Sequence, residues 1–181
     1  MRPIPKELTR NGHGRMDESL KGCCFTGHRQ IPQNLVPILK QRIKDGIEYL
    51  YSNMGVTTYY AGGALGFDSL AAEAVIEQRR ERGDVRLVIV VPCRNQDARW
   101  SAADRARYER IKREADEVIC LAEHYFDGCM HQRNRYMVDH SAYCICYLTE
   151  QRGGTAYTVQ YARERGLRIF NLAMPKGGKS Q

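Results

Sequence analysis

Short apolar runs alternate along the chain with longer stretches in which apolar residues recur every three to four positions. The longer spacing is typical of a helix with one buried face, and it is clearest from Leu35 to Leu50 and from Leu70 to Val75. It predicts helices over residues 34–53, 67–82, 101–115, 131–140 and 154–166. The apolar runs predict six strands, over residues 22–26, 57–61, 86–91, 117–121, 142–148 and 168–172.

Strands that are apolar throughout and alternate with helices are typical of a parallel sheet buried on both faces. We therefore predict an α/β fold, a Rossmann-like, doubly wound and mainly parallel sheet of five to six strands with helices on both faces. The predicted domain covers residues 21–173. Residues 1–20, rich in glycine, proline and charge, read as a flexible N-terminal arm, and residues 174–181 read as a flexible C-terminal tail.

The net charge of +7 suggests a nucleic-acid partner, but this charge is not concentrated in one part of the chain. Residues 1–21 carry +2, residues 174–181 carry another +2, and the 152 residues between them carry only +3. This central part lacks the dense one-sided run of basic residues that is typical of a nucleic-acid interface. Charge alone therefore does not decide the partner.

The seven cysteines predict a reducing compartment, because none forms a Cys-x-x-Cys pair and most lie in strand-like runs. We expect them to be buried thiols, and we take Cys129, predicted to lie in a loop, as the one candidate for reactivity. No apolar stretch approaches the roughly 20 residues of a membrane span, and the N-terminus lacks the apolar segment of a secretory signal. We expect a cytoplasmic protein with no membrane contact and no metal site.

Ligands of doubly wound sheets bind at the carboxyl ends of the strands, so the loops that follow strands are where function is expected. After the first predicted strand come Thr26, Gly27, His28 and Arg29. The glycine allows a tight turn, and Thr26 and Arg29 can each contact a phosphate or a carboxylate. The alternative is an ordinary strand-to-helix turn with an exposed arginine.

The loop after the second strand holds three glycines in five residues, Gly62, Gly63 and Gly66, with Ala64 among them. Such a loop exposes backbone N–H groups at a helix start, where they and the helix dipole attract anions. Asp68 is either part of this ligand site or the N-cap of the helix, which would make the loop structural. The spacing matches neither the dinucleotide fingerprint nor a Walker loop.

A second glycine-rich helix start, Gly153, Gly154 and Thr155, follows the fifth strand, at the same predicted edge. Two such loops indicate a cleft for a phosphorylated ligand, with Thr155 as a hydroxyl donor. Arg133 and Asn134 lie near a helix start beside this edge and could add charge and hydrogen bonds. Arg135, by contrast, is more typical of a solvated helix face.

Trp100, the only tryptophan, stands in a polar segment after the third strand, among Arg94, Gln96, Arg99 and Arg105. Its ring either stacks on a nucleobase or covers a helix. We keep both interpretations open at this point.

With these residues assembled, the chain resembles the SLOG superfamily, a Rossmann-like group that includes the DNA-processing protein DprA/Smf and the Lonely guy phosphoribohydrolases. Within that group it is most similar to the YpsA/YoqJ-like bacterial branch. The resemblance covers about residues 22–173 and implies a nucleotide or nucleotide-derived ligand at the strand ends. It rests on TGHR at 26–29, GGALGFD at 62–68, Gln96 and Trp100 with Tyr108 following, QRNRYMVDHS at 132–141, and GGTAYTVQYA at 153–162.

The resemblance also bears on whether the protein is an enzyme. The catalytic arginine of the Lonely guy enzymes would fall on Arg133, but their catalytic glutamate has no counterpart, since Tyr157 stands two residues after Thr155. A carboxylate would stabilise the oxocarbenium-like charge that develops when an N-glycosidic bond is split. Asp68, Glu123, Asp127 and Asp139 are substitutes among which the sequence does not choose.

The leading hypothesis is a sensor or regulator that binds a small nucleotide, of the NAD, ADP-ribose or nucleoside monophosphate type. The alternative is an N-glycosidase resembling the phosphoribohydrolases. Single-stranded DNA binding through the basic arm and residues 94–113 is the least favoured hypothesis, because aromatic residues do not interleave with the basic ones. Pairing into a homo-oligomer is compatible with all three.

Overall fold

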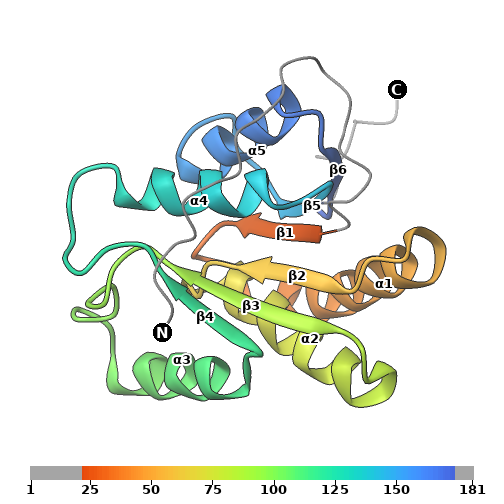
Figure 1. The fold of residues 1–181 in the computed structure, drawn as a ribbon, viewed down its shortest axis with the longest axis horizontal. Coiled ribbons are helices and arrows are strands. Elements are labelled where there is room, and N and C mark those ends of the chain that lie inside the picture. Colours follow the sequence, from red (N-terminus) through yellow and green to blue (C-terminus); the bar gives the residue numbers. More distant parts are fainter. Residues whose placement is uncertain (1–21, 174–181) are drawn as a thin grey trace.

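Six parallel strands form one sheet in the computed structural model, which describes residues 22–173. The predicted arm and tail, residues 1–20 and 174–181, lie outside the described residues. The strand order is β4-β3-β2-β1-β5-β6. Because all the strands are parallel, their carboxyl ends meet at one edge of the sheet (Figure 1). The strands are β1 (Gly22–Gly27), β2 (Thr58–Ala61), β3 (Arg86–Val91), β4 (Glu117–Cys120), β5 (Tyr143–Tyr147) and β6 (Arg168–Asn171).

Helices cover both faces of the sheet, as the alternating pattern predicts (Figure 1). On one face lie α1 (Val36–Met54), preceded by the 3-10 turn η1 (Gln33–Leu35), and α2 (Phe67–Arg82), with α3 (Ala102–Glu114) beside α2. On the other face lie α4 (Cys129–Asp139) and α5 (Gly154–Glu164). This arrangement confirms the predicted α/β Rossmann-like class.

Two hydrophobic cores lie on the two sides of the sheet. The larger one, under α1 and α2, is built around Phe25 and Tyr59, whose rings stack with centroids 6.0 Å apart. Tyr59 keeps its buried hydroxyl satisfied by donating to the Ile47 carbonyl at 3.1 Å. The smaller core, under α4 and α5, contains Cys24, Cys144 and other side chains. Both faces of the central strands are buried, which is why these strands are apolar throughout.

All seven cysteines are free thiols, and six of them are buried, Cys120 being partly exposed. The register pairs Cys24 with Cys144 across β1 and β5. Cys129 lies in the first turn of α4 and is fully buried, so the predicted loop position of this residue is wrong. Gly128, at φ 94°, turns the chain into the helix two residues earlier than the predicted start, residue 131. Burial makes Cys129 a poor candidate for reactivity.

The predicted helix and strand boundaries agree with the structure within three residues. The first helix starts as a 3-10 turn, because Pro37 stands at the second position of α1 and Pro32 precedes the turn. It ends at Gly55, whose left-handed φ of 67° terminates the helix. Within residues 22–173 no helix is long and apolar enough to cross a membrane.

Candidate functional site

The strand order reverses between β1 and β5, because strands β2 to β4 are added on one side of β1 and strands β5 and β6 on the other. A hydrogen bond connects the loops that follow β1 and β5. His28, just after β1, accepts a hydrogen bond through Nε2 from the Thr149 backbone N–H at 3.0 Å. Its ring also lies edge-on to that of Tyr147, with centroids 5.8 Å apart. Strand ends at such a switch point form the usual crevice for ligands in this class of fold. His28 thus connects the loops that follow β1 and β5 at this switch point.

The loop between β2 and α2 packs against the loop after β1. Phe67 donates its N–H to the His28 carbonyl at 3.2 Å. Gly66, with φ 76°, is the N-cap of α2, and a Cβ there would overlap the backbone of Arg29. Only glycine meets both requirements at position 66, the left-handed backbone and the close approach. Asp68 is therefore not the N-cap of α2 but lies in its first turn.

Arg133 reaches this loop from α4, on the opposite face of the sheet. Its Nη1 donates to the Gly62 carbonyl at 2.5 Å and lies 3.7 Å from Asp68 Oδ2. Its Nε donates to Asn134 Oδ1 at 2.7 Å. The Arg133 side chain is 6% exposed and that of Asp68 7%. The guanidinium therefore lies beneath the glycine loop, held by the peptide of Gly62.

Burial dominates the electrostatics of this pair. Desolvation raises the pKa of Asp68, although the Arg133 charge and hydrogen bonds from the backbone at Ala64 and Gly62 oppose the shift. Desolvation likewise lowers the pKa of Arg133, against the opposing effect of Asp68. Both shifts run toward the neutral forms, so removal from water outweighs the mutual attraction. Buried acids with a perturbed pKa are frequent at functional sites.

A chain of two hydrogen bonds, the first buried and the second partly buried, continues from Asn134, the neighbour of Arg133, to the second glycine-rich helix start. Asn134 Nδ2 donates to Thr158 Oγ1 at 2.7 Å, and Thr158 Oγ1 donates to the Gly154 carbonyl at 2.8 Å. Gly153, at φ 92°, is the N-cap of α5. A Cβ at Gly153 or Gly154 would meet nothing within 4 Å. The start of α5 is thus fixed from below and open above.

Replacing Thr158 with valine tests this relay. The shape is nearly preserved, but the buried Asn134 amide loses its acceptor, which costs about 1–3 kcal/mol. We expect the free energy of unfolding in urea to fall by that amount. Thr149→Val is the matched control, since this exposed threonine contributes its backbone N–H to His28 and keeps it in the variant. Equal stability of the two variants would contradict the role given to Thr158.

Trp100 lies partly exposed against Tyr108, their ring centroids 5.3 Å apart and edge to face. Tyr108 is buried and contacts the glycine loop, because a Cβ at Gly63 would lie 2.8 Å from its ring. Gly63 adopts φ 65°, which favours glycine independently of this contact. Trp100 therefore covers the aromatic side chain that supports the loop.

The structure brings most of the predicted site residues to one edge. Arg29 is exposed at the rim, whereas Thr26 and Thr155 are buried beneath it. The Ala64 carbonyl accepts from Ser69 Oγ at 2.9 Å, which holds the loop on the first turn of α2. The residues gathered here are Thr26, Gly27, Arg29, Gly62, Gly63, Ala64, Gly66, Asp68, Arg133, Asn134, Gly153, Gly154 and Thr155.

Among the carboxylates left open by the sequence, the geometry distinguishes Asp68. Glu123 forms an exposed ion pair with Arg94 at 2.8 Å, and Asp139 pairs with Arg165 at 3.2 Å. Asp127 is exposed in the loop before α4. Asp68 is the carboxylate beside Arg133. In residues 22–173 no group of three or more His, Cys, Asp or Glu side chains is placed to hold a metal ion.

Sequence reasoning missed Thr158, Thr149 and the structural role of His28. The only sequence signal for Thr158 is a hydroxyl four residues after Gly154, the spacing at which a helical threonine can reach a backbone carbonyl. Arg135 is exposed as predicted, but it also donates through Nε to the Tyr157 hydroxyl at 2.7 Å. Tyr157 is thus a hydrogen-bond partner of Arg135 at the position that the catalytic glutamate of the Lonely guy enzymes would occupy.

Two solved structures share this fold. DNA processing protein A from Streptococcus pneumoniae superposes with a TM-score of 0.61 and 19% identity, over 88% of this chain and 53% of that chain. The Helicobacter pylori protein of the same name, described with a single-stranded DNA binding mode, superposes with a TM-score of 0.62 and 16% identity. That match covers 90% of this chain and 71% of the other.

Related sequences come from bacteria. The YoqJ protein of the SPbeta prophage of Bacillus subtilis is 28% identical over 138 residues, which are 70% of this chain and 81% of YoqJ. A UPF0398 protein of Halalkalibacterium halodurans is 28% identical over 61% of this chain and 60% of its own length. The sequence also matches the family described as the YspA SLOG family over residues 24–171. The chain belongs to the YspA SLOG family.

Proposed function

We propose that the protein binds the phosphate of a nucleotide or nucleotide-derived ligand at the carboxyl edge of its sheet, as a sensor or regulator. The observation that carries this proposal is the pair of glycine-capped helix starts, Gly66 of α2 and Gly153 of α5, at one edge. Both are connected to the buried side chains of Arg133 and Asn134. A helix N-terminus binds anions through its unpaired N–H groups and its dipole.

The chain's residues divide the work. The backbone N–H groups at Gly154 and Thr155 would receive the phosphate, because this helix start is open above. Arg29, exposed on the rim, would add a mobile charge. Arg133 would contribute its charge from beneath the loop while it fixes the Gly62 peptide. Gly62, Gly63, Ala64 and Gly66 would line the other side of the ligand.

Replacing Gly154 with aspartate tests the proposal. The added carboxylate would stand at the proposed phosphate position and repel the ligand, while the fold is kept, since a Cβ there meets nothing and an acidic residue suits a helix start. The wild type with ligand at 100 times its dissociation constant gains about 2.7 kcal/mol, a rise of several degrees in Tm. We expect this shift for a nucleoside monophosphate, NAD or ADP-ribose, and its loss in Gly154→Asp.

Gly154→Ala is the matched control, because it adds a methyl group without charge and should retain the shift. Loss in both variants would point to steric damage instead of charge repulsion. A folded Gly154→Asp variant that keeps full affinity contradicts the assignment of the phosphate to α5. Gly63→Asp is a poorer test, since its Cβ would press on the Tyr108 ring.

Binding without turnover is favoured over N-glycosidase activity because position 157 holds a tyrosine where the phosphoribohydrolases carry a catalytic glutamate. The Tyr157 hydroxyl already accepts a hydrogen bond from Arg135. Asp68 stays below the loop beside Arg133. We expect incubation with nucleoside monophosphates to release neither free base nor ribose 5-phosphate above the uncatalysed rate. Release that disappears in Asp68→Asn would assign the enzymatic alternative to this carboxylate.

Single-stranded DNA is the second candidate, on the observation that a fold neighbour from Helicobacter pylori is described as binding it. Much of the positive charge on α3 is engaged, however, since Arg107 and Arg110 both pair with Glu73 at 2.7 Å. Binding dominated by phosphate contacts must weaken steeply with salt. Anisotropy of a labelled single strand at two salt concentrations checks this, and salt-sensitive binding without any nucleotide shift would favour DNA.

A further inference from the structure

The Gln96 side chain reaches from the segment between β3 and α3 to the glycine-rich loop after β2. A Cβ at Gly63 would lie 3.4 Å from Gln96 Nε2 and 2.8 Å from the Tyr108 ring. The absence of a side chain at Gly63 therefore lets the amide lie directly beside the loop backbone.

The amide nitrogen of Gln96 is shielded from solvent without being satisfied. Nε2 is the buried side-chain nitrogen or oxygen within residues 22–173 that has no hydrogen-bond partner. Burial raises the pKa of Tyr108, and the Gln96 amide beside its hydroxyl opposes this rise. That hydroxyl could engage only one of the two N–H groups on Nε2. At least one buried donor is therefore left without an acceptor.

A buried donor without an acceptor is rare, because it loses its hydrogen bonds to water and gains nothing in return. A ligand that supplies an acceptor removes this cost, so its hydrogen bond adds more affinity than one to a hydrated donor. Gln96 as a whole is partly exposed, so a rotation about its side-chain bonds would present Nε2 to the space above the loop. The residue thus combines an unmatched donor with a route to a ligand.

The surroundings of Nε2 favour a neutral acceptor over a phosphate. Beside Gln96, the position of a Gly63 Cβ is bordered by the Tyr108 ring and, at 3.3 Å, by the Ile89 methyl carbon Cγ2. A phosphate in this place would lose its hydration, and the neutral amide brings no charge to offset that loss. The carbonyl oxygen or ring nitrogen of a nucleobase requires no such charge, and glutamine is a common partner of base edges.

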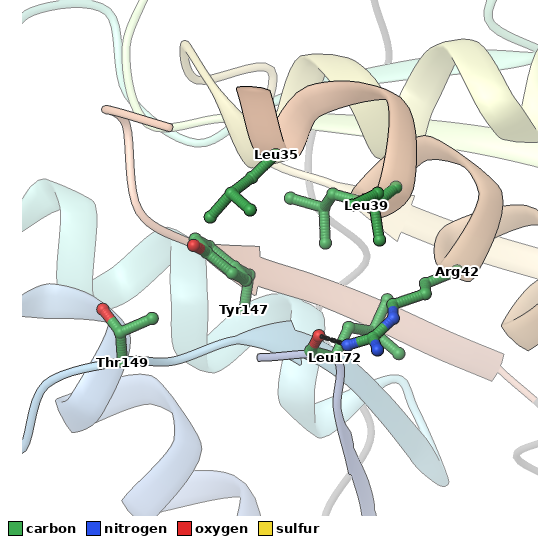
Figure 2. A pocket seen from close by; sticks show the side chains of 7 residues that line it. Leu35, Leu39, Arg42, Tyr147, Thr149 and Leu172 are labelled. Atoms are coloured by element: carbon green, nitrogen blue, oxygen red, sulfur yellow. Dashed lines mark hydrogen bonds between the residues drawn. The ribbon is translucent and has the colours of Figure 1, made fainter. Parts of the chain in front are cut away.

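The pocket beside α1 is a less suitable place for a base. It has a volume of about 130 Å³ and lies between α1 and the ends of β5 and β6 (Figure 2). Leu35, Leu39 and the Tyr147 ring form much of its wall, and the Arg42 guanidinium donates to the Leu172 carbonyl at 2.9 Å. In the part of the chain that the structure describes, the unmatched buried donor lies beside the glycine loop instead.

We propose that Gln96 Nε2 donates a hydrogen bond to the nucleobase of the ligand and thereby selects ligands that carry a base. This inference rests on the proposed function, in which the phosphate lies at the start of α5 and the glycine loop lines the other side of the ligand. Gln96 follows β3 and α5 follows β5, so the base and the phosphate would lie on opposite sides of β1 and β2. A ligand without an acceptor on its base leaves Nε2 unmatched and binds more weakly.

Replacing Gln96 with methionine in the full chain tests the unmatched donor without any ligand. Methionine has nearly the length of glutamine and no N–H group, so the variant no longer buries a donor that lacks an acceptor. We expect the Tm of the unliganded protein to rise by about 2–4 °C. Gln41→Met is the matched control, because this exposed glutamine donates to Asp45 at 2.8 Å, and its Tm should not rise. A Gln96→Met variant whose Tm does not exceed the wild-type value overturns the proposal.

Calorimetric titration then separates the base from the phosphate. The ligands are ribose 5-phosphate, the four nucleoside monophosphates AMP, GMP, CMP and UMP, NAD and ADP-ribose. The wild type should bind at least one of the base-containing ligands more tightly than ribose 5-phosphate. Gln96→Met should raise the Kd of the tightest of these about tenfold and leave the Kd of ribose 5-phosphate unchanged. Gln41→Met should change neither constant.

The outcomes distinguish a failure of this inference from a failure of the proposed function. If Gln96→Met weakens ribose 5-phosphate as much as the base-containing ligand, the amide contacts the ribose or the phosphate, and the assignment to the base is overturned. A wild type that binds ribose 5-phosphate as tightly as every other ligand leaves the phosphate site standing but overturns the role of Gln96. If the wild type binds none of the seven ligands, the proposed phosphate site fails and this inference fails with it.

Discussion

Replacing Arg133 with leucine is expected to lower the free energy of unfolding by about 3–5 kcal/mol. The substitution leaves the Asp68 carboxylate buried without its cation, and the Gly62 carbonyl and Asn134 Oδ1 without their donor. In the intact pair, the desolvation of Asp68 already outweighs its attraction to Arg133. Removal of Arg133 therefore leaves the cost of burying this carboxylate without the offset that the cation provides. Urea unfolding followed by circular dichroism measures the loss.

A double-mutant cycle with Asp68→Asn separates the charge from the packing. Asparagine removes the uncompensated carboxylate and keeps its shape, so adding it to Arg133→Leu should recover part of the lost stability. Strictly additive losses would mean that the two side chains act independently. A loss below about 1 kcal/mol in Arg133→Leu would contradict the buried pair itself, because it falls in the range of surface ion pairs.

The same cycle has a pH dependence whose sign follows from Asp68. A pKa raised in the folded state means that the contribution of Asp68 to stability is full below its unfolded pKa and is lost as pH rises through the folded pKa. Arg133 opposes this rise, so its removal raises the pKa of Asp68 further. We expect the stability deficit of Arg133→Leu to grow as pH rises past the folded pKa of Asp68 in the wild type, which lies above the ordinary aspartate value of about 4. Asp68→Asn should abolish this growth.

The sequence predicted the layout of the fold because each element carries its own local pattern. The α2 boundaries, residues 67–82, agree with the structure at both ends, and so do those of β3, residues 86–91. The parallel order follows from the alternation of strands and helices, and it brings the two glycine-rich loops to one edge. Local periodicity and turn residues therefore suffice to locate the candidate site.

The hydrogen bonds and the ion pair within the site could not be predicted from the sequence, because they join residues far apart in the chain. Arg133 contacts a carbonyl 71 residues away, and the His28 contact with Thr149 spans 121 residues. Arginine on a helix is ordinarily exposed, so nothing in its neighbours announces that Arg133 is buried. The same holds for Asp68, whose place in the first turn of α2 is also typical of a cap. Only the packing in the structure distinguishes a buried Arg133 from an exposed arginine and a buried Asp68 from a helix cap.

Replacing Gly62 with alanine is the second substitution expected to have a large effect. A Cβ at this position would overlap the guanidinium of Arg133 and lie 2.8 Å from Asp68 Oδ2. Both side chains are buried, so neither can swing into solvent to make room. Overpacking and the loss of a buried hydrogen bond together should cost about 3 kcal/mol. Thermal unfolding measures this loss directly.

Gly154→Ala is the control, because both glycines start a predicted phosphate loop and differ mainly in what surrounds them. The added methyl group at position 154 meets nothing within 4 Å, and alanine reduces the freedom of the unfolded chain. This variant should therefore match or slightly exceed the wild type in stability. If the two glycines served only to give the backbone freedom, Gly62→Ala and Gly154→Ala would have the same effect on stability. If Gly62→Ala proved as stable as Gly154→Ala, Arg133 could leave the loop at little cost, and its hydrogen bond to the Gly62 carbonyl could not be what organises the proposed phosphate site.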